Sequence, residues 1–226
     1  MGLLDQIGPV MVGPSSSHTA GACRLALLAR HVLGETPSVA RFLLHGSFAK
    51  TAQGHGTDLA LVAGVLGYPP DDPAIPHAFE HATEQGLAYE FETADLGDVH
   101  PNTVQIELTA DEQNATILGS SVGGGFVEVR EVNGFRAKFT GGANTLLALH
   151  KDQPGVIASV SSVIADDNGN ISTMFSAAQG RGGYAMMSIE MSKPLSEHVL
   201  TYLAQLDYIY WLRQLPNVMS QLEDIA

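Results

Sequence analysis

The sequence predicts an α+β fold in two parts. In the first part, segments with helical spacing of apolar residues are interspersed with segments in which apolar and polar residues alternate. In the second part the two patterns follow the order βαββαβ, and the change of pattern falls near residues 141–144. A chain of 226 residues with 45% apolar content can bury one large core or two small ones. We therefore expect a mixed sheet-and-helix domain over residues 1–142 and a βαββαβ domain over residues 143–226.

The first part opens with two amphipathic helices and a buried strand between them. In each helix apolar residues recur at steps of three and four, and a glycine suited to a left-handed end follows. Thr57 or Asp58 is expected to cap the second helix, because a short polar side chain there can accept a hydrogen bond from a free N–H. The expected segments are a helix after His18 that ends at Gly34, a strand over 38–44, a long loop over 45–58 and a helix that ends at Gly67.

Further segments complete both parts. Asn133-Gly134 predicts a tight hairpin turn, and the glycines of SSVGGG (120–125) either bring the backbone close to a ligand or only make a bend. In the first part we expect a helix over 73–86, a strand over 103–110 and a hairpin over 126–139. In the second part we expect strands over 145–151, 171–178, 183–193 and 208–215, a helix from DQPG (152–155) to about 165, and a helix over 196–206.

The second part resembles an ACT domain, a small module often found beside amino-acid enzymes. The resemblance rests on the βαββαβ order and on DQPGVIASV (152–160), which is similar to the first loop and helix of that module. If the module regulates, we expect an amino-acid effector near Asp152, Pro154 and Gly155, where N–H groups at a helix start can receive a carboxylate. The aromatic strand YIYWLRQL (208–215) suits a core or an interface better than a ligand site.

Composition excludes several classes of protein. Eleven basic residues against 24 acidic ones give a net charge of −13, which disfavours nucleic acid and anionic membranes as partners. No apolar run approaches the roughly 20 residues that span a bilayer, and the start lacks a signal-peptide pattern, so we expect a cytoplasmic protein. The lone cysteine, Cys23, excludes an internal disulfide and cannot form a zinc or iron–sulfur site by itself. Such a metal belongs on a partner chain, and Cys23 is expected to pack in the core.

Two motifs at helix starts contain the candidate functional residues. GPSSSHT (13–19) and GHGTD (54–58) each combine hydroxyls, glycine amides and one histidine where free N–H groups and the helix dipole suit a small anion. His18 and His55 are candidates for proton transfer, because histidine titrates near neutral pH; the alternative is that each imidazole only caps a helix or fills a polar niche. The parallel settings indicate one shared pocket. The candidate binding residues are Ser15, Ser16, Ser17, Thr19, Gly54, Thr57 and Asp58.

Two other histidine motifs are weaker. HAFEH (77–81) matches the H-x-x-E-H pattern of inverted zinc peptidases, but the pattern is short and no distant third ligand accompanies it. We expect exposed histidines there and no metal ligands in this chain. HPNT (100–103) offers His100 and Asn102 as binding residues, or it forms a structural turn, since Pro101 restrains the backbone.

In order along the chain, these motifs closely resemble the β chain of the bacterial iron–sulfur-dependent L-serine dehydratases. The resemblance is carried by IGPVMVGPSSSHTAGA (7–22), HGSFAKTAQGHGTDLAL (45–61), HPNT, SVGGG (121–125) and the ACT-like end. It implies an L-serine ammonia-lyase that converts L-serine to pyruvate and ammonia, in amino-acid catabolism and gluconeogenesis. It also implies a four-iron four-sulfur (4Fe-4S) cluster whose cysteines lie on an α chain, and a homodimer or heterotetramer. The first domain then resembles the allosteric substrate-binding domain of some phosphoglycerate dehydrogenases.

The resemblance also implies residue roles. His55 is expected to remove the α-proton of serine while iron on the partner acts as a Lewis acid, and His18 is expected to orient the substrate or assist proton transfer. The hydroxyls of the first motif then hold the carboxylate. An alternative from another class is a non-catalytic amino-acid-binding regulatory protein, which needs no cysteine-bearing partner.

Overall fold

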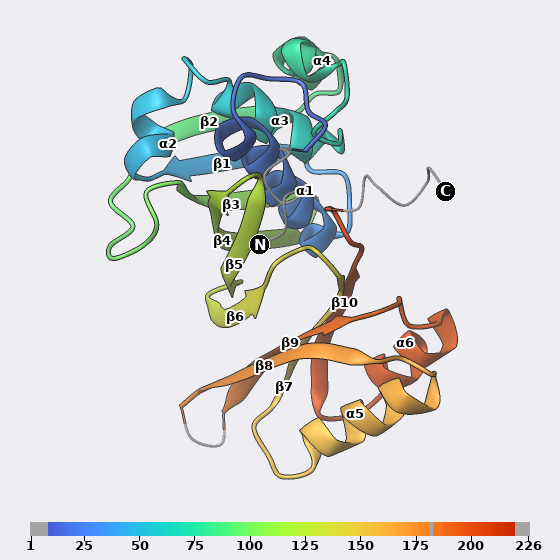
Figure 1. Ribbon diagram of the computed structural model, residues 1–226. Coiled ribbons are helices and arrows are strands. Elements are labelled where there is room, and N and C mark those ends of the chain that lie inside the picture. The colour runs from blue at the N-terminus through green and yellow to red at the C-terminus, as the bar shows by residue number, and fades with distance from the viewer. Residues whose placement is uncertain (1–8, 181–182, 220–226) are drawn as a thin grey trace.

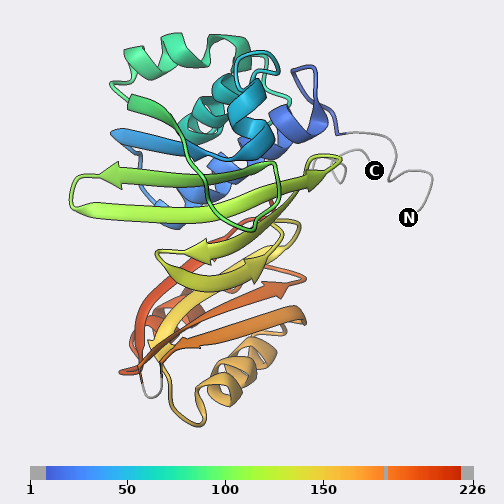
Figure 2. The same ribbon diagram turned by 90° about the vertical axis from the view of Figure 1, so that its left-hand side faces the viewer.

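The computed structural model describes residues 9–180 and 183–219 of the chain. Within these ranges the chain forms two sheets, each with helices packed on one face (Figure 1). Seen from the side, the strands of the first sheet follow one another down to its last strand, which lies next to the second sheet (Figure 2). No helix in the described ranges has both the length and the apolar character that crossing a bilayer needs.

The first sheet has six strands in the order β2-β1-β3-β4-β5-β6. They are β1 (Val39–Leu44), β2 (Ala88–Thr93), β3 (Thr103–Ala110), β4 (Gln113–Gly123), β5 (Phe126–Val132) and β6 (Phe135–Phe139). β1 and β2 run parallel, and each other neighbouring pair is antiparallel. Buried and half-buried side chains alternate along β3, which is the pattern of a sheet with one face on the core and one toward solvent.

Helices pack on the core face of this sheet. They are a π-helical turn (Ser16–Ala20), α1 (Gly21–Leu33), α2 (Gly46–Thr51), α3 (Thr57–Leu66), a 3₁₀ turn (Ile75–His77) and α4 (Ala78–Glu84). Nearly every side chain of α1 is buried, because the sheet covers one side of the helix and α3 the other. The two helices approach most closely at Gly64, where a Cβ atom would meet the carbonyl oxygen of Cys23. The π-helical turn that leads into α1 lies beside the start of α3, because Thr19 of that turn hydrogen-bonds to the carbonyl of His55.

The second sheet has the strand order β10-β7-β9-β8, and all neighbouring strands are antiparallel. The order of elements along the chain confirms the βαββαβ prediction. Its elements are β7 (Asn144–Lys151), α5 (Val156–Asp166), β8 (Ile171–Gln179), β9 (Tyr184–Met191), α6 (Glu197–Ala204) and β10 (Ile209–Leu215). Both helices lie on the same face, where Val160 and Ile164 of α5 pack on Met187 and Ile189 of β9. The module therefore has its own core.

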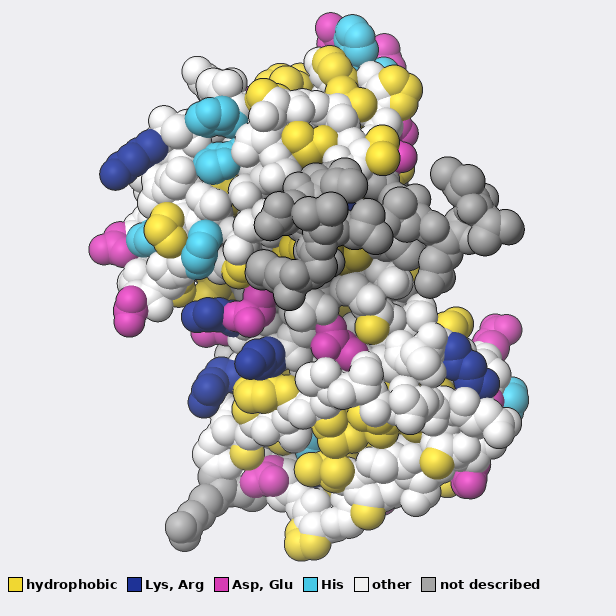
Figure 3. All heavy atoms as spheres, viewed as in Figure 1, with side chains coloured by type: hydrophobic (Ala, Val, Ile, Leu, Met, Phe, Trp, Pro, Cys, Tyr) yellow, Lys and Arg dark blue, Asp and Glu magenta, His cyan; other side chains and the backbone are white. Residues whose placement is uncertain are grey.

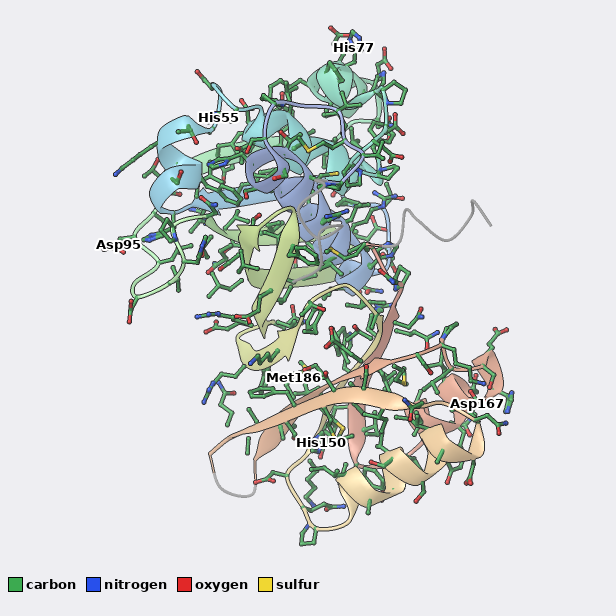
Figure 4. All side chains as sticks on the ribbon, viewed as in Figure 1. His55, His77, Asp95, His150, Asp167 and Met186 are labelled. Carbon is green, nitrogen blue, oxygen red and sulfur yellow. The ribbon has the colours of Figure 1, made fainter. Side chains whose placement is uncertain are left out.

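The opposite face of the second sheet packs against the first module. Leu147, Met186 and Leu215 belong to the same apolar cluster as the residues of α1 (Met186 is labelled in Figure 4). Arg213 of β10 donates hydrogen bonds of 3.1 and 3.0 Å to the carbonyl oxygens of Val32 and Leu33, at the end of α1. The two sheets are thus joined by a shared core, and the division at residue 142 stays a prediction.

Several sequence predictions hold, and others need correction. The hairpin turn is confirmed, with φ of 52° at Asn133 and 76° at Gly134, and α1 ends at Gly34 as expected. The predicted loop over 45–58 contains the short helix α2, and β2 and β4 were not predicted. The expectation that Thr57 or Asp58 caps α3 is wrong: the capping position is Gly56, with φ of 66° and no side-chain cap. Part of the predicted turn before β9 (181–182) and the end of the acidic tail (220–226) lie outside the described residues.

Candidate active site

The first motif places His18 between two serine hydroxyls. Ser15 caps the π-helical turn by accepting a hydrogen bond of 3.2 Å from the backbone N–H of His18, so one predicted serine does act as a cap. The Ser15 hydroxyl also lies 3.3 Å from Nδ1 of the His18 ring. On the opposite edge of the ring, Nε2 lies 3.1 Å from Oγ of Ser47, at the start of α2. Both nitrogens of this imidazole therefore have partners.

The second motif brings His55 to the same place. The His55 N–H donates to the carbonyl of Thr51 at 3.0 Å, and the hydroxyl of Thr19 donates to the His55 carbonyl at 3.2 Å, so both motifs are tied together. The His55 and His18 rings lie 5.0 Å apart between centroids. His55 is exposed at the outer side of the loop between α2 and α3 (Figure 4). Among the described residues, no group hydrogen-bonds to its ring nitrogens.

The surroundings of His18 disfavour its charged form. Burial lowers the pKa of His18, and the neighbouring His55 lowers it further, because two imidazolium charges at this distance repel. The neutral form of His18 is therefore favoured at neutral pH, and one nitrogen of a neutral imidazole can accept a proton. Histidine side chains gather at this edge of the first module, with acidic and basic side chains beside them (Figure 3).

The HPNT segment forms a turn that supports the start of α2. The N–H of Ser47 donates to the Pro101 carbonyl at 2.7 Å. Within the turn, the Asn102 N–H donates to Nδ1 of His100 at 3.1 Å. The Asn102 carbonyl accepts a 2.9 Å hydrogen bond from the Ser121 N–H, which connects the turn to the glycine-rich end of β4. These bonds support the structural reading of HPNT, and substrate contacts of His100 and Asn102 stay predictions.

The glycine-rich turn after β4 lies against the start of α1. Gly123, Gly124 and Gly125 all have positive φ, at 115°, 59° and 78°. The buried Arg24 of α1 donates a 2.8 Å hydrogen bond to the Gly125 carbonyl. A Cβ atom at Gly21 would clash with the hydroxyl of Ser121. The glycines therefore allow close approach of the strand end and the helix.

Arg24 and Ser47 were not among the residues predicted from the sequence. Ser47 lies inside the motif HGSFAK, so its place between a strand and a helix was an available signal. Arg24 was hidden because nothing in the sequence distinguishes a buried arginine from a solvated one on an amphipathic helix.

The remaining candidate binding residues differ in how far they are exposed to solvent. Ser16 and Ser17 are half-buried and Gly54 is exposed. Thr57 is 0% exposed and its hydroxyl has no partner among the described atoms, and its contact with a substrate stays a prediction. Asp58 accepts a hydrogen bond from the Leu59 N–H at 2.9 Å, and burial raises the pKa of its carboxyl.

The other reactive side chains of the first module lie apart from this site. His77 is exposed on the far side of the helical layer (Figure 4), but His81 is half-buried and lies 3.1 Å from the Tyr68 hydroxyl, so the expectation of two exposed histidines holds only for His77. Cys23 is buried as predicted, its thiol donates to the Tyr68 carbonyl, and burial raises its pKa to about 12. The described ranges contain no group of three His, Cys, Asp or Glu side chains that could hold a metal. An iron–sulfur cluster therefore does not fit the described residues of this chain.

The predicted effector loop lies in the second module. Asp152, Pro154 and Gly155 are exposed, and Gly155 precedes α5 with φ of 94°. The nearby His150 is 3% exposed; its Nδ1 lies 2.8 Å from the Lys151 carbonyl, and its Nε2 has no partner among the described atoms (Figure 4). Effector binding at this loop stays a prediction.

Comparisons with known proteins agree with this architecture. The family model "Serine dehydratase beta chain" matches residues 5–86, and the model "AHAS small subunit-like ACT domain" matches residues 146–210. The D-3-phosphoglycerate dehydrogenase of Bacillus subtilis is 24% identical over 119 residues, which are 53% of this chain and 23% of that enzyme. The fold is therefore α+β with a C-terminal ACT-like domain.

Two relatives match almost from end to end. The "L-serine dehydratase, beta chain" of Peptoniphilus asaccharolyticus is 42% identical over 195 residues, 85% of this chain and 88% of that protein. The "Probable L-serine dehydratase, beta chain" of Bacillus subtilis is 39% identical over 207 residues, 92% of this chain and 94% of that protein. At this identity and coverage, the chain belongs to the family of L-serine dehydratase beta chains.

Proposed function

We propose that this chain is the subunit of an L-serine dehydratase that binds the substrate and transfers its proton, and that an α chain supplies the 4Fe-4S cluster. The observation that carries the proposal is the meeting of His18 and His55, from motifs 37 residues apart in the sequence, beside a helix start. The names of the two relatives support the reaction class. The buried Cys23 supports placing the cluster on the partner chain.

His55 is the proposed base. It is exposed, and its ring has no hydrogen bond to the described residues, so it is free to meet a substrate presented by a partner. It takes the α-proton of serine, the electron pair forms the Cα–Cβ double bond, and the β-hydroxyl leaves as water after protonation. The resulting enamine tautomerises to an imine, which water hydrolyses to pyruvate and ammonia.

The first motif is the proposed carboxylate site. Ser16 and Ser17 are half-buried next to His18, where the N–H groups of the π-helical turn and α1 begin. Ser15 and Thr19 contribute mainly by fixing His18 and the His55 loop, since their hydroxyls already have partners. We leave Thr57 out of the substrate contacts because it is buried.

The wider setting follows from the same proposal. The enzyme works in the cytoplasm, its pyruvate enters gluconeogenesis, and the assembly contains two copies of this chain, alone or with two α chains. An amino-acid effector at residues 152–155 belongs to the proposal as its regulatory part. The alternative, a regulatory protein without enzymatic activity, has no observation that favours it over the enzyme.

The test is anaerobic purification of this chain with and without a cysteine-bearing α chain from the same organism. We expect pyruvate formation from L-serine and stoichiometric cluster absorbance only in the complex, because one buried thiol cannot hold a cluster. Cluster and turnover in this chain alone would refute the two-chain proposal. L-serine binding to this chain, with no complex and no pyruvate formed in the presence of the α chain, would favour the regulatory alternative.

A further inference from the structure

The turn between β1 and α2 fixes Ser47 before its side chain makes any contact. Gly46 has φ of 55°, and a Cβ there would come within 2.6 Å of the Pro101 carbonyl oxygen. The Ser47 N–H donates to that same oxygen at 2.7 Å, and the Ser47 carbonyl accepts a 2.8 Å hydrogen bond from the hydroxyl of Thr51. Both backbone polar groups of Ser47 are therefore engaged, one with the HPNT turn and one within α2.

From this fixed backbone, Ser47 reaches the ring of His18. Its Oγ lies 3.1 Å from Nε2, while Ser15 holds the opposite nitrogen at 3.3 Å. The next residue, Phe48, is fully buried, and its ring meets the His18 ring edge-on at 5.4 Å between centroids and 68° between planes. Polar contacts on both edges and an aromatic contact leave the imidazole one orientation, because a rotation of the ring breaks both polar contacts together.

We propose that Ser47 is a positioning residue whose hydroxyl holds the His18 imidazole in the orientation that faces His55. Without that hydroxyl, the half-buried Nε2 loses its partner, and the ring gains rotational freedom in the place where a substrate must be oriented. The consequence for catalysis rests on the proposed function, but the positioning itself does not. The competing explanation is that Ser47 only stabilises the short helix α2.

Two variants separate these explanations. Ser47→Ala removes the hydroxyl that meets His18. Thr51→Ala removes the α2 hydrogen bond to the Ser47 carbonyl, but it leaves the Ser47 hydroxyl and the bond from the Ser47 N–H to Pro101 in place. Ser47→Thr keeps a hydroxyl at the same position and serves as the rescue variant. The first measurement is the ¹⁵N chemical shift of the His18 ring nitrogens in the isolated full chain, and the second is kcat and KM for L-serine in the complex with the α chain.

We expect Ser47→Ala to shift the His18 Nε2 resonance and to lower kcat/KM about 10-fold, with Ser47→Thr restoring most of both. Thr51→Ala should leave the His18 resonances in place and kcat/KM within about 2-fold. Unchanged His18 resonances in Ser47→Ala, or equal losses in Ser47→Ala and Thr51→Ala, would overturn the proposal. If the wild-type complex has no activity, the proposed function fails, and the resonances alone decide whether Ser47 positions His18.

Discussion

Two helices of this molecule begin in the same way and have different surroundings. α3 follows Gly56, with φ of 66°, and α5 follows Gly155, with φ of 94°; neither start has a side-chain cap. At α3, hydroxyl and imidazole groups from three distant segments meet around His55 and His18. At α5, the exposed residues 152–155 come from one local loop. A helix start with free N–H groups is thus common to both modules, and the meeting of distant segments is what distinguishes the candidate active site.

A second contrast concerns histidines in the two modules. His18 is half-buried, has a partner on each ring nitrogen and lies 5.0 Å from another histidine ring. His150 is more deeply buried, and one of its nitrogens has no described partner. Burial alone therefore does not mark a functional histidine here. What distinguishes His18 from His150 is a hydroxyl partner at each ring nitrogen and a second histidine ring nearby.

The largest effect that tests this comparison is expected at His55. In the complex with the α chain, His55→Ala should lower kcat by about 10²- to 10⁴-fold, the usual range for loss of a general base. The isolated chain should keep its thermal stability, because the side chain is exposed and its ring has no described hydrogen bond. Steady-state kinetics, thermal unfolding and cluster absorbance are the measurements.

The matched control for His55 is His77→Ala, which removes another exposed histidine, outside the site. It should leave kcat unchanged. Near-native kcat in His55→Ala, or a loss explained by unfolding or by loss of the cluster, would show that the base lies elsewhere.

An intermediate effect is expected at Gly56 and Gly155, the glycines that precede α3 and α5. A Cβ at Gly56 or at Gly155 meets nothing within 4 Å, so an alanine at either position costs only the strain of a left-handed backbone, about 1 kcal/mol. Gly56→Ala should also reduce turnover, because His55 is the preceding residue, whereas Gly155→Ala should not. Urea unfolding and pyruvate formation measure the two effects, and equal turnover in the two variants would remove the distinction between the two helix starts.

The smallest effect is the pH dependence that His18 contributes to stability. Its pKa is lowered in the folded chain, so below about pH 6.5 the unfolded chain binds a proton that the folded chain does not. The free energy of unfolding should therefore fall as the pH drops through this range, and the loss should level off below the folded pKa. His18→Gln should show a weaker fall than the wild type.

The measurement is urea unfolding of both chains at about pH 7.5 and about pH 5. His77→Gln serves as the control for loss of an exposed histidine. An identical pH dependence in His18→Gln and the wild type would mean that the His18 environment does not disfavour its charged form.

Much of the fold was available in the sequence because it is encoded locally. Apolar spacing identified α1, α3 and all the elements of the second module, and Asn133-Gly134 identified the hairpin, since its left-handed residues match the twist of two paired strands. β2 was missed: its side chains are exposed or half-buried at the edge of the sheet, which leaves little apolar alternation to detect. α2 was missed because six residues are too few to show a helical period.

The sequence by itself determined the candidate residues, and the tertiary structure decided which other side chains they contact. GPSSSHT and GHGTD were visible as motifs because their residue types suit anion binding and proton transfer. That His18 meets Ser47, that Thr57 is buried and that Arg24 holds the glycine turn depend on how closely α1, α3 and β4 pack. These contacts join residues 29 and 101 positions apart, and such distances are set only when the core between them closes.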